Sequence, residues 1–386
     1  MSELKVLITN ISLVGRTGTE VYVRDLATAL LERGHTPIAY GPELGELAQE
    51  MRNKTIPVVD NLDSVSIKPD IIHGHHNNET MTALLHFPGV PAVYFIHDNL
   101  SLHDVPPVFP RILRYVAVDH TCRDRLVFEH GIAEERVRVL HNFVDLKKFK
   151  QRGPLPASPR RALLISHNHD HVSAVREACD RSGLVLDVVG QAGNNVMAEP
   201  EHVLGNYDIV FAKARCALEA MAVGTAVVLC DRVGAGPMVT TGELSELRRF
   251  NFGHRVLRMP VDNANLIREI ARYDPSDAAE VSRQIREVAG LDAAVDEVTA
   301  LYREVIAEYS TLGPDDTEAE ERAAARFLHR HSLSFNAQLK AERDRAAMFY
   351  EKYNNLALMR VRSRLLGLPL LGKFARAVDG KLKVRS

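Results

Sequence analysis

The chain has 386 residues, of which 46% are hydrophobic, and its formal net charge is −2. This length and composition predict more than one hydrophobic core. The near-neutral charge excludes a protein that binds nucleic acid along its whole surface, and no apolar run reaches the ~18 residues of a membrane-spanning helix. The four cysteines have no CxxC spacing, which favours free thiols in a reducing cytosol. We therefore expect a cytoplasmic protein, or one bound peripherally to the inner face of the cell membrane.

Strand and helix patterns alternate from the N-terminus. The apolar run KVLIT (5–9) is followed by the glycine-bearing segment GRTG (15–18) and then by an amphipathic helix that ends at Gly34. Further strands are predicted at PIAY (37–40), DIIHGH (70–75), AVYFIH (92–97) and YVAVD (115–119). Such alternation is typical of a parallel sheet with helices on its faces.

A Pro-rich basic segment at 147–162 interrupts this pattern and predicts a domain boundary. The pattern then restarts with the apolar runs ALLIS (162–166), LVLDVVG (184–190), DIVFA (208–212) and AVVLC (226–230). We predict an α/β protein with two Rossmann-like domains, 1–150 and 151–310, that face each other across a cleft. Ligands bind such folds at the carboxyl ends of parallel strands. A single continuous sheet is the alternative.

The composition changes after residue 313. Residues 311–358 are rich in Glu, Arg, Ala and Leu, which predicts a helical arm. Apolar residues near heptad spacing within 315–358 indicate either a weak coiled coil, and with it self-association, or a long helix packed on the body. The segment 359–386 has eight Lys or Arg against one Asp. It is either a basic amphipathic anchor for an anionic membrane surface or a solvated, disordered tail.

The most informative stretch is YDIVFAKARCALEAMAVGTAVVLCD (207–231). It predicts a buried strand, then a turn with Lys213 and Arg215, and a second strand after a helix. The helix is expected to open near Ala217, with Glu219 in its first turn. Unpaired backbone N–H groups at a helix start bind anions, and the two cations before it favour such a site. Alternatively, both cations are solvated turn residues.

Together with this stretch, four other segments resemble glycosyltransferases of the GT-B type, and family 4 in particular, in the order of that family. They are GRTGTEVYVRDLATALLERGHTPIAY (15–40), DIIHGHH (70–76), AVYFIHDN (92–99) and the region from VAVDHTCRDRL to VRVLHNFVDLKKF (116–149). The resemblance covers roughly residues 5–310. It implies a hexosyltransferase-like enzyme of polysaccharide biosynthesis that moves a sugar from a nucleotide-diphosphate sugar to a glycan, lipid-linked or small-molecule acceptor. Retention of configuration is expected, without a metal or another cofactor.

The resemblance also implies roles for particular residues. Glu219 corresponds to the family's Glu that grips the donor ribose, and His97 to the His beside the transferred sugar. Gly18 and Thr19 lie on the loop expected to face the acceptor, where Gly allows close approach of the backbone, although a Gly that only turns the chain is the alternative. Further donor-binding positions are expected at Ala217 in the helix start, at Ser166 and His167 as neutral donors, and at Gly234 and Gly236 in a loop over the donor.

One departure from the family pattern limits these inferences. Family 4 enzymes carry two Glu eight residues apart, but Phe211 stands eight residues before Glu219 and the turn is about six residues shorter than usual. The usual Arg and Lys that bind the diphosphate are also missing. We hypothesise that Lys213 and Arg215 replace them as catalytic cations, because a leaving diphosphate needs its charge compensated.

A metal site is not expected in SHNHDH (166–171). Asp170 directly follows His169, whereas the similar H-x-H-x-D-H signature of metal hydrolases has a residue between them, and metal geometry tolerates little displacement.

Two other functions remain open on the sequence. A nucleotide-sugar epimerase or hydrolase of the same fold would use His97 or Asp98 as acid and base. A catalytically silent scaffold would account for the lost Glu and the helical arm.

Overall fold

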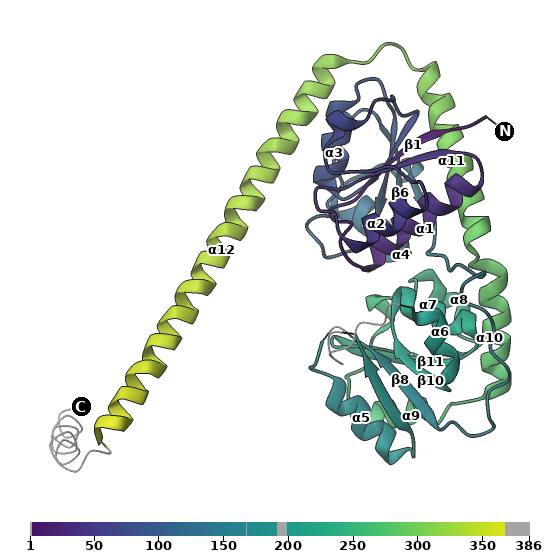
Figure 1. Ribbon diagram of the computed structural model, residues 1–386, viewed down its shortest axis with the longest axis vertical. Helices are drawn as coiled ribbons and strands as arrows, with labels where there is room; N and C mark the ends of the chain where they lie inside the picture. Colours follow the sequence, from purple (N-terminus) through teal and green to yellow (C-terminus); the bar gives the residue numbers. More distant parts are fainter. Residues whose placement is uncertain (1, 167, 191–198, 367–386) are drawn as a thin grey trace. The chain divides into compact units, whose positions relative to one another are not determined.

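The structure is a computed structural model that describes residues 2–166, 168–190 and 199–366 (Figure 1). The chain divides into two compact units, residues 1–317 and 318–386. The first unit contains both sheets, and the second is formed by helix α12 (Thr317–Leu366). Among the described residues, no helix combines the length and the apolar character needed to cross a membrane.

The first sheet has seven parallel strands in the order β3-β2-β1-β4-β5-β6-β7. Its strands are β1 (Lys5–Thr9), β2 (Thr36–Tyr40), β3 (Val58–Val59), β4 (Ile71–His75), β5 (Ala92–Ile96), β6 (Ile112–Ala117) and β7 (Val137–Val139). The central strands are apolar runs because both faces of the sheet are covered. The helices that accompany it are α1 (Gly18–Glu32), α2 (Glu46–Asn53), α3 (Asn77–His86) and α4 (His120–Asp124).

The second sheet has five strands in the order β12-β11-β10-β8-β9. Its strands are β8 (Arg161–Ile165), β9 (Val185–Val189), β10 (Ile209–Ala212), β11 (Ala226–Asp231) and β12 (Gly234–Met238). The first four are parallel, and β12 runs antiparallel to β11. The segment expected to be a loop over the donor therefore begins with an edge strand.

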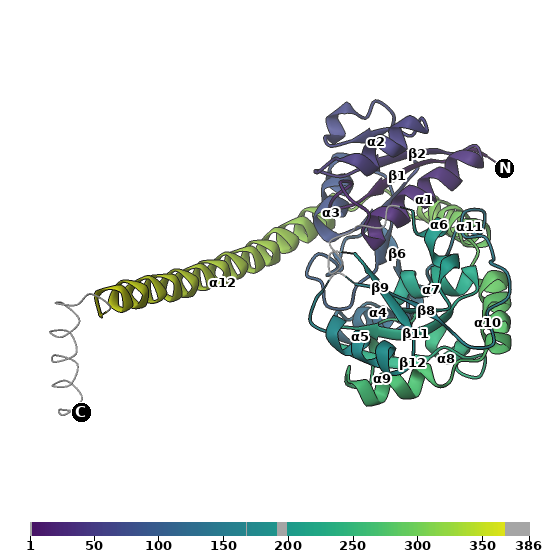
Figure 2. The same cartoon turned by 60° about the horizontal axis from the view of Figure 1, so that its bottom comes forward.

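Helices cover both faces of the second sheet (Figure 2). On one face lie α7 (Ala214–Val223), α8 (Leu244–Arg249) and α10 (Pro275–Val288), and on the other lie α5 (Val172–Arg181) and α9 (Asn263–Ile270). The short helix α6 (Pro200–Val203) precedes β10. Local chemistry sets the helix ends. The side chain of Asp274 caps the start of α10, where Pro275 fits the first turn. Gly224 ends α7 with a φ of 99°.

Helix α11 (Leu291–Thr311) completes the hydrophobic core of the first sheet, although it follows the second sheet in the sequence. Its buried residues Val295, Val298 and Tyr302 pack with α1 and α2 against strands β1, β4, β5 and β6. Residues 291–310 were predicted within the second domain, yet their apolar face belongs to the first core.

The predicted architecture, two Rossmann-like α/β sheets with a C-terminal helical extension, is confirmed, and the single continuous sheet is wrong. On α12 the side chains of Phe335, Phe349 and Tyr353 are exposed. Of the predicted basic segment 359–386, residues 367–386 lie outside the described part of the chain.

Candidate functional site

Helix α7 begins at Ala214, not near Ala217 as the sequence predicted. Lys213 is its N-cap residue, and the N–H of Ala214 donates to the carbonyl oxygen of Phe252 at 2.9 Å. Ala214 has a φ of 47°, in the left-handed region, and this lets β10 pass into α7 without further loop residues. Ala217 is therefore buried with its N–H donating to the Lys213 carbonyl at 3.3 Å, and Glu219 lies in the second turn.

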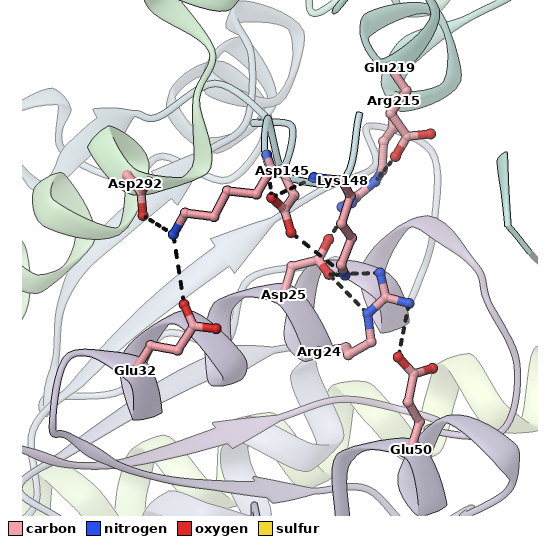
Figure 3. A network of polar contacts seen from close by, with 10 residues as sticks. Arg24, Asp25, Glu32, Glu50, Asp145, Lys148, Arg215, Glu219 and Asp292 are labelled. Carbon is pink, nitrogen blue, oxygen red and sulfur yellow. Dashed lines mark hydrogen bonds and ion pairs between the residues drawn. The ribbon is translucent and has the colours of Figure 1, made fainter. Parts of the chain in front are cut away.

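Arg215 joins the two sheet domains through a buried ion cluster (Figure 3). Its guanidinium donates to Glu219 Oε1 at 2.7 Å within α7 and to Asp25 Oδ2 at 2.5 Å on α1. Burial raises the pKa of Glu219 above its usual value, although the charge of Arg215 opposes this. Arg215 and Glu219 therefore lie on one face of α7, whereas the sequence placed Arg215 in a turn before the helix, and a carboxylate from the first sheet domain completes the group.

Asp25 is a site residue that the sequence did not single out. Its side chain is 1% exposed and also pairs with Arg24 at 2.7 Å and with Lys148 at 3.5 Å. Burial opposes its ionisation, but Arg215, Arg24 and Lys148 outweigh burial and hold the pKa of Asp25 below its usual value. The available signal was the charged pair Arg24–Asp25 inside the otherwise apolar run VYVRDLATALL, since charges are rarely buried without partners.

Lys213 points to a different set of partners in the second sheet domain. Its ammonium group contacts Asp231 at the end of β11 and Nε2 of His254. Burial opposes ionisation of Asp231, whereas Lys213 lowers the pKa of Asp231, and the net shift is downward. Neither Lys213 nor Arg215 is a solvated turn residue, because both side chains lie in ion pairs with carboxylates.

His97 follows β5 and lies in a cluster of uncharged aromatic rings. Its Nε2 is 2.8 Å from Nδ1 of the buried His75, and its ring meets that of Tyr22 edge to face. Burial, followed by the charges of His76 and Arg215, lowers the pKa of His97 to about 3. The imidazole is therefore neutral at neutral pH, where it can position a ligand by hydrogen bonding but does not carry a proton to donate as an acid.

Asp104 is a second residue that the sequence did not reveal. Its carboxyl group is buried and accepts a hydrogen bond from the backbone N–H of His97 at 3.2 Å. Burial raises the pKa of Asp104 to about 7. A buried carboxyl group with so raised a pKa, beside a predicted site residue, is a candidate participant. No local motif marks it, because its burial depends on tertiary packing.

The loop before α1 is organised by Glu20. Its carboxylate accepts hydrogen bonds from the backbone N–H groups of Val14, Gly15 and Thr17 at 2.8–3.1 Å. The spacing of Thr17 and Glu20 forms a capping box, a signal that could have identified Glu20 from the sequence. Gly18 and Thr19, predicted on the acceptor side, are the first two residues of α1.

Ser166, Gly234 and Gly236, which were predicted to bind the donor, are held by contacts within the protein. The hydroxyl of Ser166 donates to the carbonyl of Asn168 at 3.0 Å and accepts from the N–H of Asn168. A Cβ added to Gly234 would lie 2.7 Å from the carbonyl oxygen of Leu257, and one on Gly236 would meet atoms at 2.9 Å. Packing of β12 thus requires both glycines whether or not a donor binds. His167 lies outside the described residues.

A cavity of about 290 Å³ lies next to the ion cluster, and both Asp25 and Lys148 line it. The rest of its wall comes from α1, from Lys54 after α2, from the segment after β7 and from the ends of α10 and α11. Within residues 2–166, 168–190 and 199–366, no three His, Cys, Asp or Glu side chains are grouped as metal ligands would be.

The arrangement of two Rossmann-like sheets joined through α11 is the fold of GT-B glycosyltransferases. A glycosyltransferase from Rickettsia africae ESF-5 has a TM-score of 0.58 at 12% identity, over 79% of this chain and 99% of its own. Anabaena Alr3699/HepE, solved in complex with UDP and glucose, has a TM-score of 0.55 at 15% identity, over 78% and 100%. The lipopolysaccharide outer core galactosyltransferase WaaB, in its apo form, has a TM-score of 0.50 at 12% identity, over 78% and 100%.

Residues 16–148 match the family model described as Glycosyltransferase Family 4. This segment holds Gly18, Asp25 and His97. The resemblance to a divergent family 4 glycosyltransferase of the GT-B type is thereby confirmed. No match to a curated protein was found.

Proposed function

We propose that this protein transfers a sugar from a nucleoside-diphosphate sugar to a glycan, lipid-linked or small-molecule acceptor. The observation that supports the proposal is the start of α7. It lies at the carboxyl end of β10, carries Lys213 and Arg215, and has Glu219 ion-paired to Arg215. Because Anabaena HepE was solved with UDP and glucose, UDP and UDP-glucose are the first ligands to test.

The start of α7 offers backbone donors to the diphosphate as well as cations. Of the first four N–H groups of the helix, those of Ala214 and Ala217 bond to carbonyl oxygens. The N–H groups of Arg215 and Cys216 lie in the same first turn, where a helix supplies no carbonyl acceptor of its own. Such groups, with the positive end of the helix dipole, stabilise a phosphate. A bound diphosphate would replace Asp231 as the ion-pair partner of Lys213, and it would bind Arg215 while Arg215 stays paired with Glu219.

In this mechanism no side chain acts as a strong base. The departing diphosphate accepts the proton of the attacking acceptor hydroxyl, the bond from the sugar to the diphosphate breaks, and the acceptor oxygen bonds to the same face of the sugar. Retention follows from that geometry. The protein contributes position and charge compensation, which account for much of catalysis in such transfers. The neutral imidazole of His97 suits a hydrogen bond to the transferred sugar. No metal or cofactor is required by this scheme.

The acceptor would approach the loop that Glu20 holds before α1. A Cβ on Gly18 would meet no protein atom within 4 Å, so the protein's own packing does not require a glycine there. Close approach of a ligand to the backbone would explain its presence.

The basic segment 359–386 would keep the enzyme at an anionic membrane surface near a lipid-linked acceptor, and deletion of 359–386 is expected to lower its partition onto anionic liposomes.

Thermal stability of the full chain with UDP, GDP and ADP, followed by donor turnover with the matching sugar nucleotides, tests the proposal. A ligand that binds only the folded protein raises its melting temperature. We expect one diphosphate to stabilise the chain, and the matching sugar nucleotide to be consumed faster when acceptor is added. Failure of every diphosphate to bind would overturn the proposal.

A catalytically silent scaffold is the second candidate. It is favoured by the ion pairs of Lys213 with Asp231 and of Arg215 with Asp25, which already neutralise the two cations. It predicts neither diphosphate binding nor donor turnover. An epimerase or hydrolase would instead change the donor without any acceptor, and product analysis in the absence of acceptor separates it from a transferase.

A further inference from the structure

The cavity beside Asp25 lies between the two sheet domains, and no residue of α7 lines it. Its wall includes Lys54 after α2, Thr28 on α1 and Arg286 on α10. Its volume of about 290 Å³ is at the lower end of the ~300–1,000 Å³ typical of ligand pockets. That size suits a small polar ligand rather than a complete sugar nucleotide.

The carboxylates and the cations on this wall differ in their ion pairing. Each carboxylate that lines the cavity is ion-paired; these residues are Asp25, Glu32, Asp145, Glu287 and Asp292. Figure 3 shows four of the five, Asp25, Glu32, Asp145 and Asp292. In contrast, no carboxylate in the described part of the chain lies within ion-pair distance of Lys54 or Arg286, although Glu50 and Asp25 act on Lys54 from farther away. Arg286 uses Nη1 to donate to the carbonyl oxygens of Phe149 and Ala222, at 2.8 and 3.0 Å.

Thr28 provides an independent observation. Its hydroxyl oxygen is buried and has no hydrogen-bond partner among the described residues, although the residue lines the cavity. A buried polar atom without a partner destabilises the fold, so its presence points to a ligand that forms the missing hydrogen bond. The pKa of Lys54 is lowered by burial and then by the nearby charge of Lys148, against the opposing charges of Glu50 and Asp25, and the charge of a bound anion would offset this lowering.

We propose that this cavity binds a small phosphate-bearing anion, with Lys54 and Arg286 as its cationic contacts and Thr28 as its hydroxyl donor. The two cations come from different sheet domains, so the bound anion bridges them. The site is separate from the diphosphate site proposed at α7, because Lys213 and the start of α7 do not line the cavity.

The test is calorimetric titration of the full chain with inorganic phosphate, glucose 1-phosphate and UDP at constant ionic strength. Phosphate or glucose 1-phosphate is expected to bind, and Lys54→Met to weaken that binding at least tenfold. Thr28→Val, which keeps the side-chain shape, is expected to weaken binding while leaving the empty protein at least as stable, because no hydrogen bond is lost. Lys150→Met is the control for charge, since Lys150 is exposed and does not line the cavity.

Absence of binding by both phosphate and glucose 1-phosphate would overturn the inference, as would equal affinities of the Lys54, Thr28 and Lys150 variants. Binding of UDP alone, sensitive to Lys213→Ala, would support the proposed transferase and reject this second site. If phosphate binds while UDP, GDP and ADP all fail to bind, the cavity proposal stands and the transferase proposal fails. If glucose 1-phosphate binds more tightly than inorganic phosphate, the ligand is a sugar phosphate. If these two compounds bind with equal affinity, the protein recognises the phosphate group alone and the ligand is the free ion.

Discussion

Arg215 on α7 and Asp25 on α1 form an ion pair at 2.5 Å that connects the two sheet domains. The residues are 190 positions apart in the sequence. Glu219 shares the same guanidinium from within α7. The expected donor site is thus tied directly to the helix that follows the acceptor-side loop, and any ligand that engages Arg215 acts on both domains.

Replacing Asp25 with Asn should destabilise the protein. The change leaves Arg24, Lys148 and Arg215 around a neutral amide, and breaking a buried ion pair from one side costs about 3 kcal/mol or more. Urea unfolding of Asp25→Asn measures this loss. Asp296→Asn is the control, because Asp296 is 73% exposed in its pair with Arg33 and should change the free energy of unfolding by less than about 1 kcal/mol. Equal losses in the two variants would contradict a central role for Asp25.

Lys213→Ala should weaken the binding of the preferred nucleoside diphosphate by about tenfold or more, since a hydrogen bond to a charged group is worth ~1.5–3 kcal/mol. The variant leaves Asp231 without its lysine, so circular dichroism must first show that it is folded. Calorimetric titration then compares it with Lys150→Ala, which removes an exposed lysine elsewhere. Unchanged affinity in Lys213→Ala would exclude a phosphate contact by this residue.

Stability should fall as the pH is lowered from about 6.5 to 4. Burial lowers the pKa of His76 and His141 to about 4 and that of His97 to about 3. In this pH range the unfolded chain therefore binds protons that the folded chain does not. At pH 5 each of these histidines lowers the free energy of unfolding by on the order of 1–2 kcal/mol. Asp104 acts in the opposite direction, because its raised pKa of about 7 favours the folded state at low pH.

Urea unfolding at pH 7.5, 6 and 5 measures the balance of these groups. Among the described residues, the histidines whose pKa is lowered outnumber the carboxyl groups whose pKa is raised, which are Glu79, Asp104, Asp119 and Glu219, so a net loss is expected. In Asp104→Asn the carboxyl contribution is removed, and the fall in stability between pH 7 and pH 5 should become steeper than in the wild type. Stability that is constant or higher at pH 5 would mean that the histidines are not buried in their neutral form.

Ala214→Gly should stabilise the protein by up to about 1 kcal/mol. The left-handed φ of 47° at Ala214 strains a residue with a Cβ by ~1–2 kcal/mol, and this exceeds the entropic cost of a glycine. Ala220→Gly, in the interior of the same helix, should instead destabilise by about 1 kcal/mol or more. Melting temperatures that move in the same direction for both variants would show that Ala214 is unstrained.

Glycine substitutions should separate packing from ligand approach. Gly236→Ala is expected to lower the melting temperature without any ligand, because its Cβ would lie 2.9 Å from Leu229 and from the carbonyl oxygen of Val256. Gly18→Ala places its Cβ in open space and should leave the melting temperature unchanged while lowering transfer to the acceptor. Full transferase activity in folded Gly18→Ala would remove the acceptor-side role of Gly18.

The sequence by itself determined the alternation of strands and helices, the two separate sheets, and the strand and helix around Glu219, although not that the helix begins directly after Lys213. These features depend on local periodicity and on contacts a few residues apart. The pairing of Arg215 with Glu219 follows from their spacing of four residues on one helix. The resemblance to family 4 glycosyltransferases followed from the order of the matching segments along the chain.

Only the tertiary structure decided which charges meet. Asp25 becomes a site residue because packing buries it beside Arg215, 190 positions away in the sequence, and no local pattern encodes that contact. Asp104 and Asp231 lie nearer in the sequence to their partners His97 and Lys213, but folding is still needed to bring each pair together. The same applies to α11, whose apolar face is evident from the sequence but whose partner is the first sheet. Burial removes water from these groups, and the free energy of each charge then depends on neighbours that folding alone brings together.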